Sequence, residues 1–352
     1  MKILYLSPNM AQYGGAQYQH DVMQELARQA EVFFYGPGFR AYDAADTIAD
    51  ALRKSPFPSG PDLILVGHAW LEDKPGAPVE KFPHIDLGAT RLPRAAILNK
   101  EYTNLAAKLA WIERVSASTV FTHHHDAASF QARTGIPFVF WPFAADHRLF
   151  HPPTEPKTFD LGFSGILQNP TPGMQTDLRV RIMERLFECE RDIPQRPREW
   201  SRSLRFYFNG LPRDPADRAL AEARGTYKRL DTPQYAAKVR ACRAFLCTRS
   251  PADLVSPRYF ECMLSRTLVL AEHNPAHAAV FPPGSFIEFG DEDAFQASLL
   301  AALDSPATPA MLDFAQRHAQ AHHTWQVRIR AMLNALSQML SGAAPARHES
   351  AA

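Results

Sequence analysis

Short apolar runs, rich in β-branched and aromatic residues, alternate along the chain with segments of helical periodicity. In the first half the runs lie at residues 2–7, 31–36, 63–67, 95–99, 119–122 and 137–141. In the second half they lie at residues 160–165, 205–209, 244–248, 267–271 and 286–289. Strand-like runs that alternate with helices are typical of βα units. The pattern therefore predicts an α/β protein with two doubly wound parallel sheets of five or six strands each.

Two helical segments stand out by their apolar positions. Between the first two runs the predicted apolar face consists of Tyr18, Val22, Met23, Leu26 and Ala27. A last helical stretch is predicted from about Pro309 to Leu340. Its apolar positions are Leu312, Phe314, Trp325, Ile329, Met332, Leu336 and Leu340.

Three prolines in HPPTEPKTF, residues 151–159, interrupt the pattern just before a new buried strand. We therefore predict one domain over residues 1–152 and a second over residues 153–320. A helix over residues 321–340 is expected to cross back to the first domain. The small and polar tail, residues 341–352, is expected to be disordered.

Composition excludes several classes of function. The chain of 352 residues has 38 Lys and Arg against 37 Asp and Glu, a net charge of +1. This balance predicts no general attraction to nucleic acid. There is no long apolar run, and the start is too short for a signal peptide. We expect a cytoplasmic protein, with peripheral contact to the inner membrane left open. The four cysteines form no C-x-x-C pair, which favours free buried thiols.

Ligands of open α/β sheets bind outside the carboxyl ends of the strands, so residues that follow strands are candidates. After the first strand, Gly14 and Gly15 precede a helix, where the backbone can approach an anion. The third strand ends at His68. Glu101 follows the fourth strand, either as a functional carboxylate or paired with Lys100.

Three histidines and an aspartate follow the fifth strand. Side chains alternate along a strand, so at most His123 and His125 share a face. A metal site there lacks an evident third ligand, and hydrogen-bonding or general-base roles are favoured. Asp126 is predicted to be the N-cap of a short helix that ends at Gly135.

In the second half, small, hydroxyl and basic residues follow the strands. Ser164 and Gly165 follow one strand, and Arg249 follows another between Thr248 and Ser250. Lys228 lies with Arg229 in a further basic pair. Such residues can bind phosphate. Each is also compatible with an ordinary turn or a solvated surface.

A helix is predicted to begin near Ser256 or Pro257, with Ser256 as its cap. Glu261 then lies about one turn into this helix, and Asp253 precedes it. A carboxylate at this position can accept two hydrogen bonds from a vicinal diol such as ribose. The alternatives are a favourable placement against the helix dipole or a salt bridge to Arg258.

Three segments resemble the group 1 nucleotide-sugar glycosyltransferases of GT-B fold, in the branch typified by spore-maturation-protein-type glycosyltransferases. They are WPFAADHRLFHPP (141–153), SPRYFECMLSRTLVLAEHN (256–274) and HHTWQVRIRAML (322–333). The resemblance implies two Rossmann-like domains that face each other across a cleft. It implies an acceptor-side N-terminal domain and a C-terminal domain that binds the nucleotide sugar.

In the retaining branch of that superfamily the second glutamate of a Glu-x7-Glu motif binds the donor ribose, and this position is Glu261 here. The first position is Asp253, a shorter acid, and Cys262 follows Glu261 where a small residue is usual. These departures leave retention or inversion of configuration open.

The resemblance implies a metal-independent glycosyltransferase without a cofactor, which moves a sugar from a nucleotide diphosphate sugar to an acceptor hydroxyl. The residues expected near the diphosphate are Ser164, Gly165, Arg249 and Ser256, with charge from Arg258 or Lys228. If the reaction inverts, the candidate bases are Glu101, His68, His123 and His125.

The expected partners are a nucleotide-sugar donor and a glycan, lipid-linked, protein or small-molecule acceptor, within bacterial surface glycan or glycoconjugate synthesis. Two alternatives stay open. One is a metal-dependent hydrolase built on His123, His125 and Asp126. The other is a GT-B-like nucleotide-binding protein without catalytic activity.

Overall fold

The computed structural model describes residues 1–13, 17–167, 177–191, 193–212 and 214–342. Every predicted apolar run forms a strand. The contacts divide the chain into two compact units, residues 1–144 with the segment that begins at Trp325, and residues 145–324. We call these unit 1 and unit 2. The acceptor and donor roles predicted for the two domains stay predictions.

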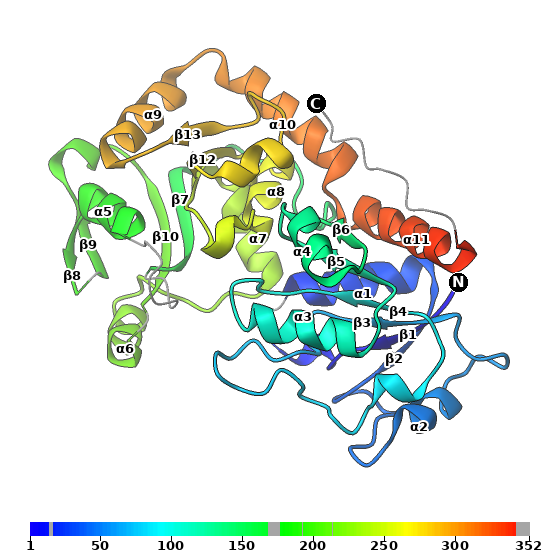
Figure 1. Ribbon diagram of the computed structural model, residues 1–352. Helices are drawn as coiled ribbons and strands as arrows, with labels where there is room; N and C mark the ends of the chain where they lie inside the picture. The colour runs from blue at the N-terminus through cyan, green and yellow to red at the C-terminus, as the bar shows by residue number, and fades with distance from the viewer. Residues whose placement is uncertain (14–16, 168–176, 192, 213, 343–352) are drawn as a thin grey trace. The chain divides into compact units, whose positions relative to one another are not determined.

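Unit 1 contains a six-stranded parallel sheet in the order β2-β1-β3-β4-β5-β6. Its strands are β1 (Lys2–Leu6), β2 (Glu31–Tyr35), β3 (Leu63–Val66), β4 (Arg94–Ile97), β5 (Thr119–Thr122) and β6 (Phe138–Phe140). The helices are η1 (Met10–Gln12), α1 (Gln17–Gln29), α2 (Ile48–Arg53), η2 (Leu87–Ala89), α3 (Leu105–Arg114), α4 (Ala127–Thr134) and α11 (Trp325–Ser341). Figure 1 shows α11, the last helix, lying alongside α1.

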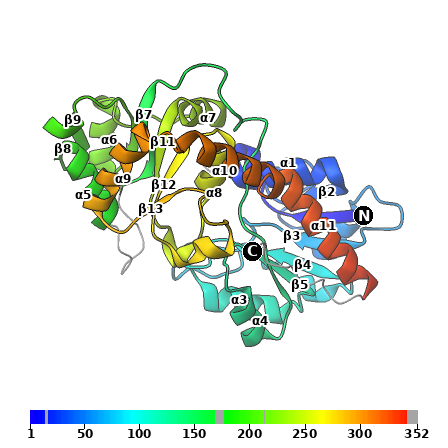
Figure 2. The ribbon, with the colours of Figure 1, turned by 90° about the horizontal axis from the view of Figure 1, so that it is seen from above.

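Unit 2 contains a five-stranded parallel sheet in the order β10-β7-β11-β12-β13. Its strands are β7 (Phe159–Ile166), β10 (Phe206–Leu211), β11 (Cys242–Cys247), β12 (Leu268–Glu272) and β13 (Ile287–Phe289). The helices are α5 (Asp177–Leu186), η3 (Glu199–Ser201), α6 (Pro215–Ala223), α7 (Thr232–Arg240), η4 (Pro251–Asp253), α8 (Pro257–Leu264), η5 (Pro275–Ala279), α9 (Glu292–Asp304) and α10 (Thr308–His322). Figure 2 shows this sheet between α5 and α9 on one face and α7, α8 and α10 on the other.

One element of unit 2 was not predicted. An antiparallel hairpin joins β8 (Phe187–Glu190) to β9 (Ile193–Pro197). Its sequences, FECE and IPQRP, carry charged residues and prolines, so they lack the apolar run by which the parallel strands are recognised. Parallel strands have long apolar runs because helices cover both faces of their sheets.

The first predicted helix forms, but its buried face differs from the prediction. Val22, Met23 and Leu26 are buried, whereas Ala27 is exposed. Asp21 and Glu25 are buried in its place. Hydrogen bonds make this possible, since Gln17 donates to Asp21 at 2.7 Å and Gln29 donates to Glu25 at 2.8 Å.

The predicted helix ends are confirmed with one exception. Asp126 accepts a hydrogen bond from the Ser129 backbone N–H, and α4 ends at Gly135 with a φ of 70°. Helix α8 begins at Pro257 as predicted, but the Ser256 side chain makes no capping hydrogen bond. The capping role predicted for Ser256 is therefore wrong.

The predicted C-terminal helical stretch is two helices, α10 and α11, and not one. The break falls at His323 and Thr324, where the backbone pairs with Ala145 in a parallel bridge. The Ala145 N–H donates to the His323 carbonyl at 3.1 Å, which replaces helical hydrogen bonding there. Of the predicted apolar positions in α11, Trp325, Ile329, Met332 and Leu336 are buried.

The four cysteines all lie in described ranges and form no disulfide, and three of them are buried, as predicted. None of the helices in the described ranges has the length and apolar content needed to cross a membrane. Gly14 and Gly15 lie outside the described residues, as does the predicted disordered tail from residue 343 onward.

Candidate functional site

The carboxyl end of β7 in unit 2 is built around Gly165 and Arg258. Gly165 has a φ of +146°, a region that glycine alone adopts readily. A Cβ at Gly165 would lie 3.1 Å from Nη2 and 3.6 Å from Nη1 of Arg258. The guanidinium of Arg258, in the first turn of α8, thus packs against the end of β7 because residue 165 has no side chain.

A second guanidinium, that of Arg179 in α5, lies at the same edge of the sheet. Its Nε donates to Oγ1 of Thr248 at 2.6 Å, and its Nη1 donates to the Ile166 carbonyl. Burial and the neighbouring positive charge of Arg258 lower the pKa of Arg179 to about 10. Two like charges held this close favour a bound anion, which removes their repulsion.

Glu261 lies one turn beyond Arg258 on α8 and is held by a tyrosine. Oη of Tyr235, in α7, donates to Oε2 of Glu261 at 2.9 Å. Burial raises the pKa of Glu261, while Arg258 and the hydrogen bond from Tyr235 act in the opposite direction. The carboxylate is therefore fixed by one oxygen beside a positive group.

Arg249 and Asp253, two further candidates, form an ion pair with each other. The backbone N–H of Arg249 donates to Glu272 at 2.8 Å. Ala252 and Asp253 have φ values of 52° and 58°, an uncommon conformation for residues other than glycine. The loop that joins β11 to α8 is thus strained, and the pairing offsets the charge of Arg249.

Ser164 and Lys228 are linked through Asn209 on the neighbouring strand β10. Asn209 Nδ2 donates to Oγ of Ser164 at 3.5 Å, and the Lys228 backbone N–H donates to Oδ1 of Asn209 at 2.7 Å. The Lys228 side chain is exposed. The structure therefore anchors the Lys228 backbone, and its ammonium is in solvent.

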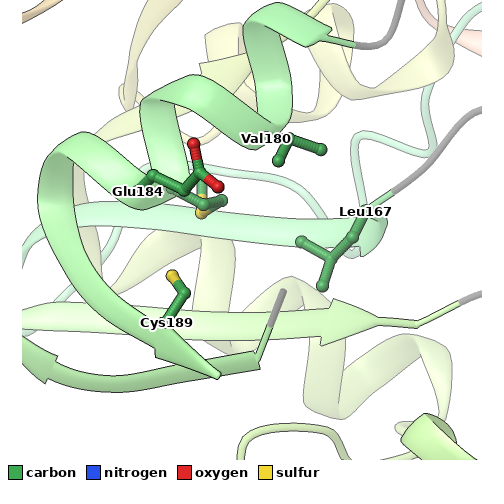
Figure 3. Close-up of a pocket in the computed structure, with 5 residues that line it drawn as sticks. Leu167, Val180, Glu184 and Cys189 are labelled. Atoms are coloured by element: carbon green, nitrogen blue, oxygen red, sulfur yellow. The ribbon is translucent and has the colours of Figure 1, made fainter. Parts of the chain in front are cut away.

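A small pocket in unit 2 lies apart from these charges. Figure 3 shows Leu167, Val180, Glu184 and Cys189 around it, with Met183 as the fifth lining residue. Its walls are mostly apolar, and the space between them has no room for a water molecule. This pocket does not suit a phosphate or a sugar, unlike the edge that carries Arg179 and Arg258.

In unit 1 the structure brings His68, after β3, against His123, after β5. Their Nε2 atoms are 2.9 Å apart. Nδ1 of His123 lies 2.8 Å from the Trp141 carbonyl, and the His123 ring stacks on Phe143 with centroids 3.7 Å apart. Burial lowers the pKa of His123 to about 4, and burial together with His123 lowers that of His68.

Glu101 is buried beside this pair. Its Oε1 accepts hydrogen bonds from Oγ1 of Thr122 at 2.7 Å and from the His123 backbone N–H at 2.8 Å. Lys100 points elsewhere, with Nζ 3.7 Å from Asp73. The alternative pairing of Lys100 with Glu101 is therefore wrong.

The structure separates His125 from His123. The ring of His125 stacks on His124, with centroids 4.7 Å apart, and Asp126 caps α4. Within the described ranges, no three His, Cys, Asp or Glu side chains are grouped so that they could hold a metal ion. The set proposed for a hydrolase is thus not brought together.

A polar network in unit 1 was not predicted from the sequence. Oη of Tyr18 donates to Asn99 at 2.9 Å, Asn99 donates to Asp73 at 2.9 Å, and Lys108 donates to Asp73 at 2.6 Å. Lys108 is 1% exposed although it carries a charge. The network joins residues that are far apart in the chain, so local sequence patterns do not predict it. The lysine at a buried position of α3 was a signal that could have pointed to a buried charged partner.

Comparisons with known proteins agree with this architecture. Residues 198–334 match the family model described as glycosyl transferase-like. Among solved structures, the chain is similar to sucrose-phosphate synthase from Thermosynechococcus elongatus at 13% identity and a TM-score of 0.58, over 97% of this chain and 100% of that one. No curated protein matches the chain.

Two further structures are similar at 14% identity. HepE of Anabaena, in complex with UDP-glucose, has a TM-score of 0.61 over 96% of this chain and 100% of that one. AviGT4, a glycosyltransferase involved in avilamycin A biosynthesis, has a TM-score of 0.55 over 97% and 99%. The fold is GT-B, and the resemblance to GT-B glycosyltransferases is confirmed. The spore-maturation-protein-type branch stays a prediction.

Proposed function

We propose that this GT-B protein is a glycosyltransferase that moves a sugar from a nucleotide diphosphate sugar to an acceptor hydroxyl, with the donor bound by unit 2. The observation that carries the proposal is the packing of Arg258 against Gly165 beside Arg179, with Glu261 one turn further along α8. Two adjacent guanidinium groups can donate charge-assisted hydrogen bonds to a diphosphate, and a nearby carboxylate can accept hydrogen bonds from the ribose hydroxyls.

The negative charge that develops on the departing diphosphate needs fixed donors. In this proposal Arg258 and Arg179 supply them, with Ser164, Arg249, Ser256 and Lys228 kept as further candidates. Because these guanidinium groups are already positive, the transfer is proposed to require no metal ion and no cofactor.

Glu261 is proposed to accept hydrogen bonds from the ribose hydroxyls. Tyr235 fixes one carboxylate oxygen at 2.9 Å, which orients the other. Asp253 is proposed to contribute little to donor binding because it is paired with Arg249. HepE, a protein of similar fold, is described in complex with UDP-glucose, which supports a nucleotide-sugar donor for this chain.

The acceptor is proposed to bind to unit 1, at the carboxyl edge that carries His68, Glu101 and His123. A glycan or lipid-linked acceptor in surface glycan synthesis fits the proposal, and so do a protein and a small molecule. His125 is the weakest of the candidate bases because it stacks on His124 and not on this cluster.

The proposal is tested by a thermal-shift screen of the EDTA-treated protein against UDP, GDP, TDP, CDP and ADP, each with and without a common sugar. A ligand that binds only the folded state raises the melting temperature by mass action, about 2.7 kcal/mol at 100 times its dissociation constant. We expect one nucleotide to stabilise the protein without a metal ion.

Two other outcomes would redirect the assignment. Stabilisation by a divalent ion alone, with none by any nucleotide, would contradict the proposal and favour a metal-dependent enzyme. Nucleotide binding without consumption of any nucleotide sugar, in the presence of candidate acceptors, would indicate a binding protein without catalytic activity.

A further inference from the structure

An open groove lies on the surface of unit 2, where α5, η3 and the start of α9 meet. Its volume of about 330 Å³ is at the lower end of the roughly 300–1,000 Å³ typical of small-molecule sites. Its lining residues are Arg181, Glu184, Arg185, Arg198, Trp200 and Glu292. Figure 2 shows α5 and α9 together on one face of the sheet. Unlike the apolar pocket beside Cys189, this groove has room for a ligand.

The groove is separate from the edge that carries Arg179 and Arg258. Successive residues of a helix are turned by about 100°, so Arg179 and Arg181, two positions apart on α5, point to opposite sides. Arg179 donates to Thr248 at 2.6 Å, whereas Arg181 donates to Glu292 at 3.0 Å. The groove residues of α5 are spaced i, i+3 and i+4, which places them together on one side of the helix.

One wall of the groove is fixed to the end of α5. Carbonyl groups in the last turn of a helix have no partner within the helix. Here Nε1 of Trp200 donates to the Arg185 carbonyl at 2.9 Å, and Nε of Arg198 donates to the Glu184 carbonyl. The backbone N–H of Arg198 donates to the Leu186 carbonyl at 2.9 Å. The indole and the guanidinium are therefore held in place before a ligand binds, which lowers the entropic cost of binding.

The groove has one unpaired positive group and one unpaired negative group. Arg181 and Arg185 each form an ion pair with an acidic residue of α9. Arg198 and Glu184 are both exposed. Within the described residues, neither the Nη atoms of Arg198 nor the carboxylate of Glu184 has a hydrogen-bond or ion-pair partner. The groups left for a ligand are thus a guanidinium donor and a carboxylate acceptor beside an indole ring.

We propose that this groove is a saccharide-binding site, in which a sugar ring packs on Trp200 and its hydroxyls bond to Arg198 and Glu184. A hydroxyl group both donates and accepts hydrogen bonds, which matches a donor placed beside an acceptor. The ring carbons of a sugar form an apolar face, and an indole offers a large flat apolar surface for it. A nucleic acid or a polyphosphate would instead need an excess of unpaired positive groups.

This inference goes beyond the proposed function and does not depend on it. The groove is open, so a sugar within a longer glycan fits as well as a terminal one. In a glycosyltransferase, a second saccharide site keeps a bound glycan at a high local concentration between transfers. The site itself needs no nucleotide, because none of its groups belongs to the edge proposed to bind the diphosphate.

Trp200 gives the groove a selective spectroscopic signal. The chain has five tryptophans, and all of them lie in described ranges. Trp70, Trp111, Trp141 and Trp325 are buried, whereas Trp200 is partly exposed. In the full chain labelled with 5-fluorotryptophan, the fluorine-19 signal of Trp200 is identified by its loss in Trp200→Phe. A ligand in the groove should move this signal and leave the other four in place.

The test titrates the labelled full chain, without nucleotide, with maltotriose, cellotriose and N,N′,N″-triacetylchitotriose. We expect at least one of them to move the Trp200 signal in a saturable way. A contact this small should give a Kd on the order of 1 mM. Because the ligand is neutral, this Kd should change by less than about twofold between about 0.05 and 0.5 M NaCl.

Two variants and a control assign the binding to the groove. Arg198→Gln should weaken binding about tenfold, because it removes the charged donor. Glu184→Ala should also weaken binding, and its carboxylate has no partner whose loss would affect folding. Arg224→Gln is the matched control, since Arg224 lies at the end of α6 and bonds to Glu190 at 2.8 Å. The control should bind like the wild type, and all three should keep the wild-type melting temperature.

Three results would overturn the proposal. One is a Trp200 signal that none of the three saccharides moves, at concentrations well above the expected Kd. Another is movement with inorganic phosphate or with a charged peptide, but with no saccharide. The third is unchanged affinity in both Arg198→Gln and Glu184→Ala. A chain that binds a saccharide here but neither binds a nucleotide nor transfers a sugar would contradict the proposed function alone.

Discussion

The carboxyl edges of the two parallel sheets carry different chemistry. In unit 2 the edge holds two guanidinium groups, from Arg179 and Arg258, which arise from helices. In unit 1 the edge holds two neutral imidazoles, from His68, two residues beyond β3, and from His123, which directly follows β5. The edge of unit 2 is the one proposed to bind the diphosphate, and the edge of unit 1 carries the residues proposed as candidate bases.

Burial lowers the pKa of the histidines at the unit 1 edge and raises the pKa of the carboxyl group at the unit 2 edge. In unit 1 burial lowers the pKa of His68 and His123, so the folded state resists protonation. In unit 2 burial raises the pKa of Glu261, so the folded state takes up a proton more readily. As the pH falls, the histidines therefore lose stabilisation while the cost of burying the Glu261 carboxylate is relieved.

The largest expected effect is acid destabilisation through His123. Its pKa of about 4 in the folded protein lies below the ordinary 6.5, so the stabilisation is lost as the pH falls from about 6.5 to about 4. A shift of this size corresponds to roughly 3 kcal/mol. Urea unfolding at pH 7 and pH 4 should show this loss in the wild type, and most of it should be absent in His123→Gln. An equal loss in both proteins would show that other groups dominate.

The second prediction concerns the close approach of Arg258 to Gly165. Gly165→Ala should destabilise the protein by about 1–3 kcal/mol because of its backbone conformation. It should also weaken nucleotide binding about tenfold, since the new Cβ would displace a guanidinium nitrogen that lies 3.1 Å away.

Gly225→Ala separates the two contributions. Gly225 also has a positive φ, +71°, but a Cβ there would meet no atom within 4 Å. This control should lose stability without losing nucleotide affinity in a calorimetric titration. Equal losses of affinity in the two variants would contradict the role given to Gly165.

The smallest effect is expected at Glu261. Glu261→Gln keeps an acceptor for Tyr235 but removes the negative charge. The preference for the nucleoside diphosphate selected by the thermal-shift screen over its 2′-deoxy form should therefore fall by about tenfold, or 1.4 kcal/mol. Folding should be unaffected, because burial already disfavours this carboxylate. Glu188→Gln, on the β8–β9 hairpin, is the control. An unaltered preference in Glu261→Gln would contradict the proposal that Glu261 binds the ribose.

The fold was largely predictable because buried parallel strands are continuous apolar runs. The β8–β9 hairpin was not predicted because its sequences, FECE and IPQRP, carry charged residues and prolines and so lack a continuous apolar run. The break between α10 and α11 was not predicted because it coincides with a bridge to Ala145, which is far away in the chain.

The candidate sites were predictable only in part. Gly165, Arg258 and Glu261 follow strands or begin a helix, and the sequence marked them. Arg179 was not predicted as a site residue. It shares α5 with Arg181 and Arg185, and such a run of arginines is typical of a solvated helix surface. Tertiary packing brings Tyr235 to Glu261, and no local signal predicts that contact.

The pairing of His68 with His123 shows why local periodicity failed in unit 1. Alternation along a strand placed His123 with His125, but β5 ends at Thr122. Beyond the strand end the alternation no longer applies. His123 instead meets a residue that follows a different strand of the same sheet.

One calorimetric titration tests most directly the proposal that the edge of unit 2, and not that of unit 1, binds the nucleotide. The nucleoside diphosphate selected by the thermal-shift screen is titrated in EDTA into the wild type, Arg258→Ala and His68→Gln. Loss of a charge-assisted phosphate contact costs about 1.5–3 kcal/mol, so Arg258→Ala should bind roughly 10- to 150-fold more weakly. His68→Gln should bind like the wild type. Unchanged affinity in Arg258→Ala, or an equal loss in His68→Gln, would contradict the assignment of nucleotide binding to unit 2.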